Sequence, residues 1–200
     1  MLPTQFIEYY KKHIRPNKMW QWHGYKLEKY ADDAMLYAEA IFNKKPDFLI
    51  ETGTHWGGST LFFAHMMDLV GSGQVISIDI GNDEQKDKLP KHPRITYLSG
   101  SSVDLSIIEQ IKSRIKNSTA MVSLDSDHSR EHVARELVLY SPLVTSGQYM
   151  VVEDTSTIRL RGARRALFDF IKNDCSGFKH IKINKKITIS NCVDGWLLKR

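Results

Sequence analysis

The sequence has few cysteines and no long apolar run, so it lacks two features that mark disulfide-rich, zinc-binding and membrane proteins. Its 200 residues include only two cysteines, Cys175 and Cys192, with no CxxC spacing and no metal-type Cys/His cluster, so we expect neither a disulfide framework nor a structural zinc. Nowhere do about 18 consecutive apolar residues occur, and the amino terminus lacks the apolar core of a signal peptide. We therefore expect no membrane span, no export signal and a cytoplasmic location.

A strong charge of one sign is also missing. The formal net charge is +5, and lysine and arginine are spread along the chain apart from short runs at 159–165 and 179–186. A basic nucleic-acid-binding module is one alternative function, but the sequence has no recognition motif, aromatic-basic stripe or arginine-rich arm to carry it. Nucleic acid is thus an unlikely partner, and the basic runs are typical of solvated faces.

The length suits one domain spanning residues 1–200, because domains of roughly 100 to 200 residues are common. Helical periodicity at 4–14 and 28–43 predicts an amino-terminal helical cap, assigned here to residues 1–45, ahead of a core at 46–200. In the core, apolar runs of strand length alternate with amphipathic stretches. Predicted strands lie at 46–53, 71–80, 94–102, 119–127, 149–155, 180–190 and 195–200, and predicted helices at 59–70, 106–116, 132–144 and 163–173.

This alternation predicts an α/β fold: a Rossmann-like, doubly wound, mainly parallel sheet with helices on both faces. The last two strands, joined by a short turn, predict an antiparallel edge at the carboxyl terminus. In such sheets ligands bind at the carboxyl ends of the strands. The motifs described next all fall at such ends.

The run FLIETGTHWGGSTLFF, residues 48–63, places a glycine-rich turn between a strand and a helix. Glycines let the backbone approach a ligand, and the start of the helix offers free N–H groups. A dinucleotide fingerprint needs G-x-G-x-x-G, but His55 stands where its second glycine should be, which disfavours a nicotinamide-dependent oxidoreductase. Glu51 would suit an ammonium group better than a phosphate, so the turn favours a cofactor that carries an amino acid.

Two further strands are followed by polar residues. Asp79 ends an apolar strand about 20 residues beyond the glycine turn, where an acid binds ribose hydroxyls in such folds. A surface aspartate at a strand end is nearly as good an interpretation of this position alone. Ser101 and Ser102 lie in the polar turn after the third strand.

Carboxylates follow the next two strands. Asp125 ends one, Glu153 and Asp154 end the other, and we expect the three to converge at neighbouring strand ends. Clustered carboxylates repel one another unless they bind a cation, and an oxygen-rich set without cysteine predicts Mg²⁺, with Mn²⁺ or Ca²⁺ as alternatives. Asp127 is an alternative to Asp125 as the ligand.

Together these motifs resemble those of class I S-adenosylmethionine-dependent methyltransferases of the metal-dependent catechol type. They are most similar to the cephalosporin hydroxylase-like family, with its KPD-x-x-IETGT-x-x-GGS and LDSDH motifs and its sugar O-methyltransferases, over roughly residues 20–170. The resemblance implies S-adenosylmethionine and a divalent metal on Asp125, Glu153 and Asp154. The cofactor-binding residues that it implies are Glu51, Gly53, Thr54, Gly57, Gly58, Ser59, Asp79, Ser101, Ser102 and Asp125.

The resemblance also implies a mechanism. His128 stands three residues after Asp125, where the catechol-type enzymes have a lysine base, and we expect it to take the proton of an acceptor hydroxyl on a small molecule or sugar. The alternative is a histidine that only opens the following helix. The word hydroxylase suggests an oxygenase iron site of two histidines and one carboxylate, but no such triad is evident in the sequence. A homo-oligomer is compatible with these features.

Overall fold

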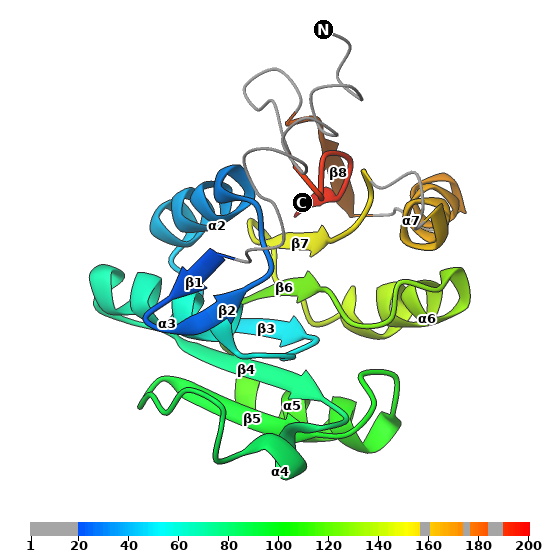
Figure 1. Cartoon of the computed structure of the whole chain (residues 1–200). Helices are drawn as coiled ribbons and strands as arrows, with labels where there is room; N and C mark the ends of the chain where they lie inside the picture. Colours follow the sequence, from blue (N-terminus) through cyan, green and yellow to red (C-terminus); the bar gives the residue numbers. More distant parts are fainter. Residues whose placement is uncertain (1–19, 157–160, 174–176, 184–189) are drawn as a thin grey trace, which may run out of the picture.

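A computed structural model of the chain describes residues 20–156, 161–173, 177–183 and 190–200. Figure 1 shows one central twisted sheet with helices on both sides and a small hairpin beside it. The helix predicted at 4–14 lies outside the described residues. None of the described helices is long and apolar enough to cross a membrane.

Parallel strands form most of the central sheet, as expected. In the described residues it has seven strands in the order β5-β4-β3-β6-β7-β9-β8, and the first five are parallel. Their residues alternate between two cores because successive side chains point to opposite faces. The parallel strands are β3 (Phe48–Thr52), β4 (Gln74–Asp79), β5 (Ile95–Ser99), β6 (Ala120–Leu124) and β7 (Tyr149–Val152).

Helices cover both faces, which confirms the doubly wound fold. α2 (Ala31–Lys44) and α3 (Gly58–Val70) pack on the face that contains Leu49 and Met121. α5 (Leu105–Ile115), α6 (Arg130–Tyr140) and α7 (Arg161–Asn173) pack on the face that contains Ile50 and Val122. One short helix that the sequence analysis did not predict, α4 (Asn82–Gln85), follows β4.

The carboxyl-terminal edge is antiparallel, as predicted. β8 (Phe178–Ile181) pairs with β9 (Trp196–Lys199), and β9 pairs with β7, so the last strand lies between the two that precede it. The predicted strand at 180–190 is wrong in its start, because β8 begins earlier. Most of that range lies outside the described residues.

The described part of the amino-terminal cap is not only helical. The helix predicted at 28–43 is α2, but ahead of it β1 (Trp20–Trp22) and β2 (Tyr25–Leu27) form an antiparallel hairpin. Its two-residue turn, His23-Gly24, has positive φ at both positions (48° and 87°), the geometry that matches the twist of paired strands. The sequence contains a signal for this hairpin, because a glycine turn separates two short segments in which apolar and polar residues alternate.

Two glycines show how closely the chain packs around the first strand end. A Cβ atom on Gly53 would lie 2.0 Å from the carbonyl oxygen of Asp125, and one on Gly58 would lie 2.1 Å from that of Lys26. Real Cβ atoms do not approach so closely. The turn after β3 is therefore pressed against the end of β6, and the start of α3 against the hairpin.

A pair of substitutions tests this packing. Gly53 and Gly71 have nearly the same φ (+88° and +87°), but nothing lies within 4 Å of a Cβ on Gly71. Gly71→Ala is expected to lower the free energy of unfolding by about 1–2 kcal/mol, the cost of the left-handed backbone, and Gly53→Ala by roughly 4 kcal/mol or more because of the added clash. Urea denaturation measures both. Equal costs would contradict the close approach.

Candidate active site

A cavity of about 810 Å³ opens at the carboxyl ends of the parallel strands. Segments that follow β3, β4, β5, β6 and β7 line it, together with residues just after the hairpin. Most of the residues that the sequence analysis selected meet here. They are Gly53, Thr54, Gly58, Ser59, Asp79, Ser101, Ser102, Asp125, His128, Glu153 and Asp154.

The glycine turn is held by the acid at the end of the neighbouring strand. His55 adopts a left-handed backbone (φ 47°), the conformation that favours glycine, and its backbone N–H donates to Asp79 Oδ2 at 3.0 Å. The other oxygen, Asp79 Oδ1, accepts from the N–H of Gly81 at 3.1 Å. A histidine at the second glycine position is thus accommodated by a backbone hydrogen bond, at the cost of some strain.

Glu51 and Gly57 do not line the cavity. Glu51 is fully buried, and its carboxylate accepts hydrogen bonds from the hydroxyls of Ser59, Thr60 and Ser77. Burial raises the pKa of Glu51, and these hydroxyls and Lys29 oppose that rise. The structure therefore places Glu51 beneath the turn, where it ties β3 to β4 and to the start of α3. Its contact with a cofactor ammonium stays a prediction.

The wall after β5 contains a hydroxyl and imidazole network. Ser102 Oγ lies 2.8 Å from His132 Nε2, and Ser126 Oγ lies 3.1 Å from the same nitrogen. Ser126 donates to the fully buried Glu136 at 2.7 Å. A hydrogen bond that the Glu136 carboxylate accepts is the main reason why the pKa of His132 is raised. Ser102 was expected at this wall, whereas His132 and Ser126 were not.

A buried lysine lies between the carboxylates. Lys29 Nζ donates to Asp125 Oδ2 at 3.0 Å and to Glu153 Oε1 at 2.9 Å, and the residue is only 2% exposed. Tyr37, fully buried on α2, donates to the same Glu153 oxygen at 2.6 Å. The sequence analysis missed both partners, because each lies more than 90 residues from the carboxylate that it contacts.

A second acid lies behind Glu153. Asp33 on α2 accepts hydrogen bonds from the Ser190 hydroxyl, the Asn191 N–H and the Cys192 thiol. Burial, followed by the charge of Glu153, raises the pKa of Asp33 to about 6. Burial also raises the pKa of Cys192, which is a free thiol among the described residues. This cluster concentrates negative charge behind the cavity wall.

The remaining site residues converge on one point. His128 Nε2 lies 3.1 Å from Asp154 Oδ2, and donor atoms of Asp125, His128 and Asp154 all lie within 4.8 Å of one another. Asp127 is exposed and accepts the N–H of Ser129 at 2.7 Å, so of the two aspartates it is Asp125 that joins the cluster. Asp154 has a left-handed backbone (φ 55°), a strained state often found at functional sites.

Electrostatics at this point favours a cation. Burial raises the pKa of Asp125 well above its ordinary value, Lys29 opposes the rise, and Glu153 and Asp154 add to it. Neutralising charge is therefore needed beyond that of Lys29. The carboxylates of Asp125 and Asp154 provide oxygen donors for a divalent ion, so these two residues fit the predicted Mg²⁺.

The comparisons with known proteins agree with this geometry. The sequence profile of the family described as Rhamnosyl O-methyltransferase/CmcI matches residues 16–200. The chain belongs to this family. It is therefore an O-methyltransferase by family, which confirms the resemblance stated from the motifs.

Similar proteins include two mycobacterial enzymes. The Rhamnosyl O-methyltransferase of Mycobacterium leprae (strain TN) is 38% identical over 162 residues, which cover 77% of this chain and 70% of that protein. The protein of the same name from Mycobacterium tuberculosis (strain ATCC 25618 / H37Rv) is 34% identical over 156 residues, which cover 74% of this chain. The chain spans only 63% of that second relative.

Solved structures confirm the fold. The Mg–SAM form of CmcI has a TM-score of 0.70 at 19% identity and covers 90% of this chain and 76% of its own. MycE, a methyltransferase from the mycinamycin pathway in complex with Mg, SAH and mycinamycin VI, has a TM-score of 0.54 at 19% identity, covering 71% of this chain and 42% of its own.

The buried lysine gives a testable prediction. Lys29→Met leaves Asp125 and Glu153 without their shared cation, and breaking a buried ion pair costs about 3–5 kcal/mol. We expect a loss of this size in unfolding free energy without divalent cations, and a larger rise in Tm on adding Mg²⁺ than in wild type. Lys26→Met is the control, because Lys26 is exposed and lies over the Trp56 ring. Equal losses in the two variants would contradict the role of Lys29.

Proposed function

We propose that this protein transfers a methyl group from S-adenosylmethionine to a hydroxyl of a sugar or a small natural product, with the help of a divalent metal. The observation that carries the proposal is the meeting of the glycine turn, Asp79 and the carboxylate cluster in one cavity. Membership of the Rhamnosyl O-methyltransferase/CmcI family supports it. The names of the similar proteins support the two cofactors and a sugar-bearing acceptor.

The cofactor is proposed to lie along the first three strand ends. Gly53, Gly58 and Ser59 line the cavity at the turn where the backbone can approach a ligand closely. Asp79 Oδ1 and Oδ2 are already fixed by backbone N–H groups and can still accept from ribose hydroxyls, since a carboxylate has about four acceptor sites. Thr54, Ser101 and Ser102 complete this side of the cavity.

The metal is proposed to bind at the other side, on Asp125 and Asp154, with Glu153 beside them. Bound Mg²⁺ would supply a positive charge that lowers the pKa of an acceptor hydroxyl. Glu153 Oε1 already accepts hydrogen bonds from both Lys29 and Tyr37. Whether this oxygen also binds the ion depends on whether these two hydrogen bonds are retained when the metal binds. The choice of Glu153 as a direct ligand stays a prediction.

His128 is proposed as the general base. Its contact with Asp154 orients the imidazole toward the carboxylate cluster, where an acceptor hydroxyl would lie. The imidazole would take the proton of the acceptor hydroxyl. S-adenosylmethionine, held at the first three strand ends, would supply the methyl group to that oxygen and leave as S-adenosylhomocysteine. The imidazole then releases the proton to solvent, which is possible because His128 is 29% exposed.

The acceptor's identity, a homo-oligomer and a cytoplasmic location stay predictions. The cavity rim adds polar groups next to the reaction point: Glu28 pairs with His55 at 3.0 Å, and Lys26 lies 4.1 Å from the centroid of the exposed Trp56 ring. An aromatic ring between charged side chains suits a sugar, whose C–H face stacks and whose hydroxyls form hydrogen bonds.

Ligand-dependent melting tests the cofactor. S-adenosylhomocysteine is expected to raise the Tm, and a ligand present at about 100 times its Kd adds roughly 2.7 kcal/mol of stability. NAD is expected to have no such effect because His55 interrupts the dinucleotide fingerprint. Asp79→Asn should weaken the response to S-adenosylhomocysteine. A shift with NAD alone would refute the cofactor assignment in favour of an oxidoreductase.

Removal of the base tests the mechanism. His128→Gln is expected to lower kcat by about 10²–10⁴, most severely at low pH, where little of the acceptor hydroxyl ionises unaided. S-adenosylhomocysteine binding should stay unchanged, and EDTA should abolish turnover in wild type without abolishing cofactor binding. His180→Gln, on β8 and outside the cavity lining, is the matched control. A pH–rate profile that is unaltered in His128→Gln would remove this residue from the mechanism.

A further inference from the structure

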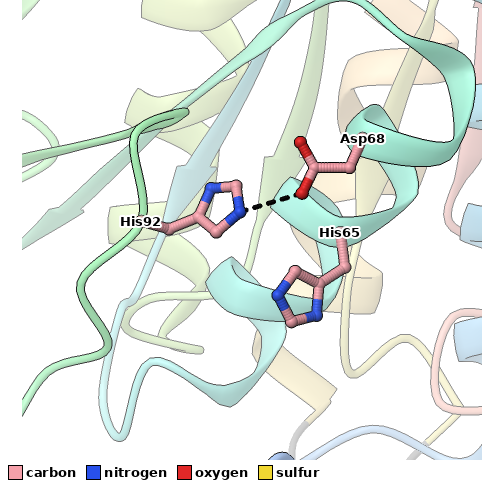
Figure 2. Close-up of side chains that lie close together, drawn as sticks. All are labelled: His65, Asp68 and His92. Carbon is pink, nitrogen blue, oxygen red and sulfur yellow. Dashed lines mark hydrogen bonds and ion pairs between the residues drawn. The ribbon is translucent and has the colours of Figure 1, made fainter.

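A second cluster of metal-ligating side chains lies away from the cavity. His65 and Asp68 are three residues apart on α3, and His92 comes from the loop that leads into β5. Figure 2 shows the three side chains facing one another, with His92 bonded to Asp68. One donor atom from each lies within 4.8 Å of the others, and none of the three lines the cavity.

We propose that His65, Asp68 and His92 bind one divalent transition-metal ion of the Zn²⁺ type, at a site separate from the carboxylate cluster. Two imidazoles and one carboxylate form a common donor set for such ions. The sequence analysis found no triad of this kind, because His92 lies 24 residues beyond Asp68 and only the fold brings them together.

The spacing of the donors suits a small ion. In a tetrahedral zinc site with bonds of about 2.0–2.1 Å, neighbouring donors are roughly 3.3 Å apart. His92 Nε2 and Asp68 Oδ2 are already 2.9 Å apart. Small side-chain rotations would bring the three donors to the required distance. A tetrahedral ion would take its fourth ligand from solvent, since Asp68 is 45% exposed.

The carboxylate is held in place for this role. Arg94 Nε donates to Asp68 Oδ1 at 2.6 Å while its Nη1 donates to the carbonyl of Gly73 at 2.8 Å. One carboxylate oxygen is thereby fixed and the other faces the histidines. Supporting hydrogen bonds of this kind orient the ligands of metal sites.

Protonation of the histidines sets a condition on binding. A histidine that binds a metal ion must be neutral, with a free lone pair on the ligating nitrogen. The Trp22 indole donates to His65 Nδ1 at 2.9 Å, and the N–H of Arg94 donates to His92 Nδ1 at 3.2 Å. In the metal-free protein these bonds leave the ring protons on Nε2. Metal binding through Nε2 would move those protons to Nδ1, where they would break the contacts with the Trp22 indole and with the N–H of Arg94.

The site lies where three segments of the chain meet. Trp22 belongs to the hairpin, His65 to the helix that starts at the glycine turn, and His92 to the loop whose Pro90 packs against Gly57. A bound ion would therefore stabilise the contact between α3 and the loop that leads into β5. His65, Asp68 and His92 do not line the cavity. An ion bound to them would therefore have a stabilising role and would not be an oxygenase centre.

Zinc titration of tag-free protein in excess Mg²⁺ tests the proposal, with the heat of binding and the tryptophan emission followed together. Wild type is expected to bind one Zn²⁺ with a change in emission, because the Trp22 bond is disturbed. His65→Gln and His92→Gln should each weaken this binding by about 10- to 100-fold or more. Asp125→Asn and the control His180→Gln should keep it.

Three results would overturn the proposal: no zinc binding, equal binding in both triad variants and wild type, or binding lost in Asp125→Asn alone, which would assign the ion to the carboxylate cluster.

A measurement on wild type avoids any folding defect of the variants. The ¹⁵N resonances of the His65 and His92 rings should shift on adding Zn²⁺, and unshifted rings would also overturn the site.

Discussion

Repulsion among the carboxylates at the ends of β6 and β7 is the constraint on which the rest of the site depends. Asp125, Glu153 and Asp154 are brought together because two adjacent parallel strands end side by side. Ionised carboxylates that are buried away from water are stable only beside positive charge. Lys29 provides one such charge, and its contacts with two carboxylates determine where the segment before α2 must lie.

That segment also shapes the cofactor side of the cavity. The carbonyl of Lys26 packs against Gly58, Glu28 pairs with His55, and the Lys26 ammonium lies over Trp56. The residues that compensate the carboxylates and those that enclose the glycine turn thus come from one stretch of the chain. Loss of its position would open the cavity and expose the charge cluster at the same time.

Local patterns in the sequence predicted the parallel strands, the longer helices and the strand ends at which the site forms, but not the hairpin β1–β2 or the short helix α4. The glycine turn, Asp79 and the acids after β6 and β7 were identified because each follows directly from an apolar strand. Lys29 and Tyr37 could not be found in this way, since nothing in a local pattern links a lysine to acids 96 and 124 residues away. Glu51 was expected beside the ligand because an acid next to the glycine turn suits an ammonium group. Its side chain points beneath the turn, toward three hydroxyls that no spacing rule brings together.

Two contacts with α3 explain how the hairpin places Lys29 accurately. Near the start of the helix, Gly58 admits the backbone of Lys26. Two turns later, His65 accepts the indole N–H of Trp22, whose ring also packs edge-on against Phe62 at 5.1 Å. A hairpin fixed at two points along one helix cannot rotate about either of them. The lysine that follows is therefore held at a defined distance from the ends of β6 and β7, and the histidine cluster on α3, though outside the cavity, helps to set the charge balance within it.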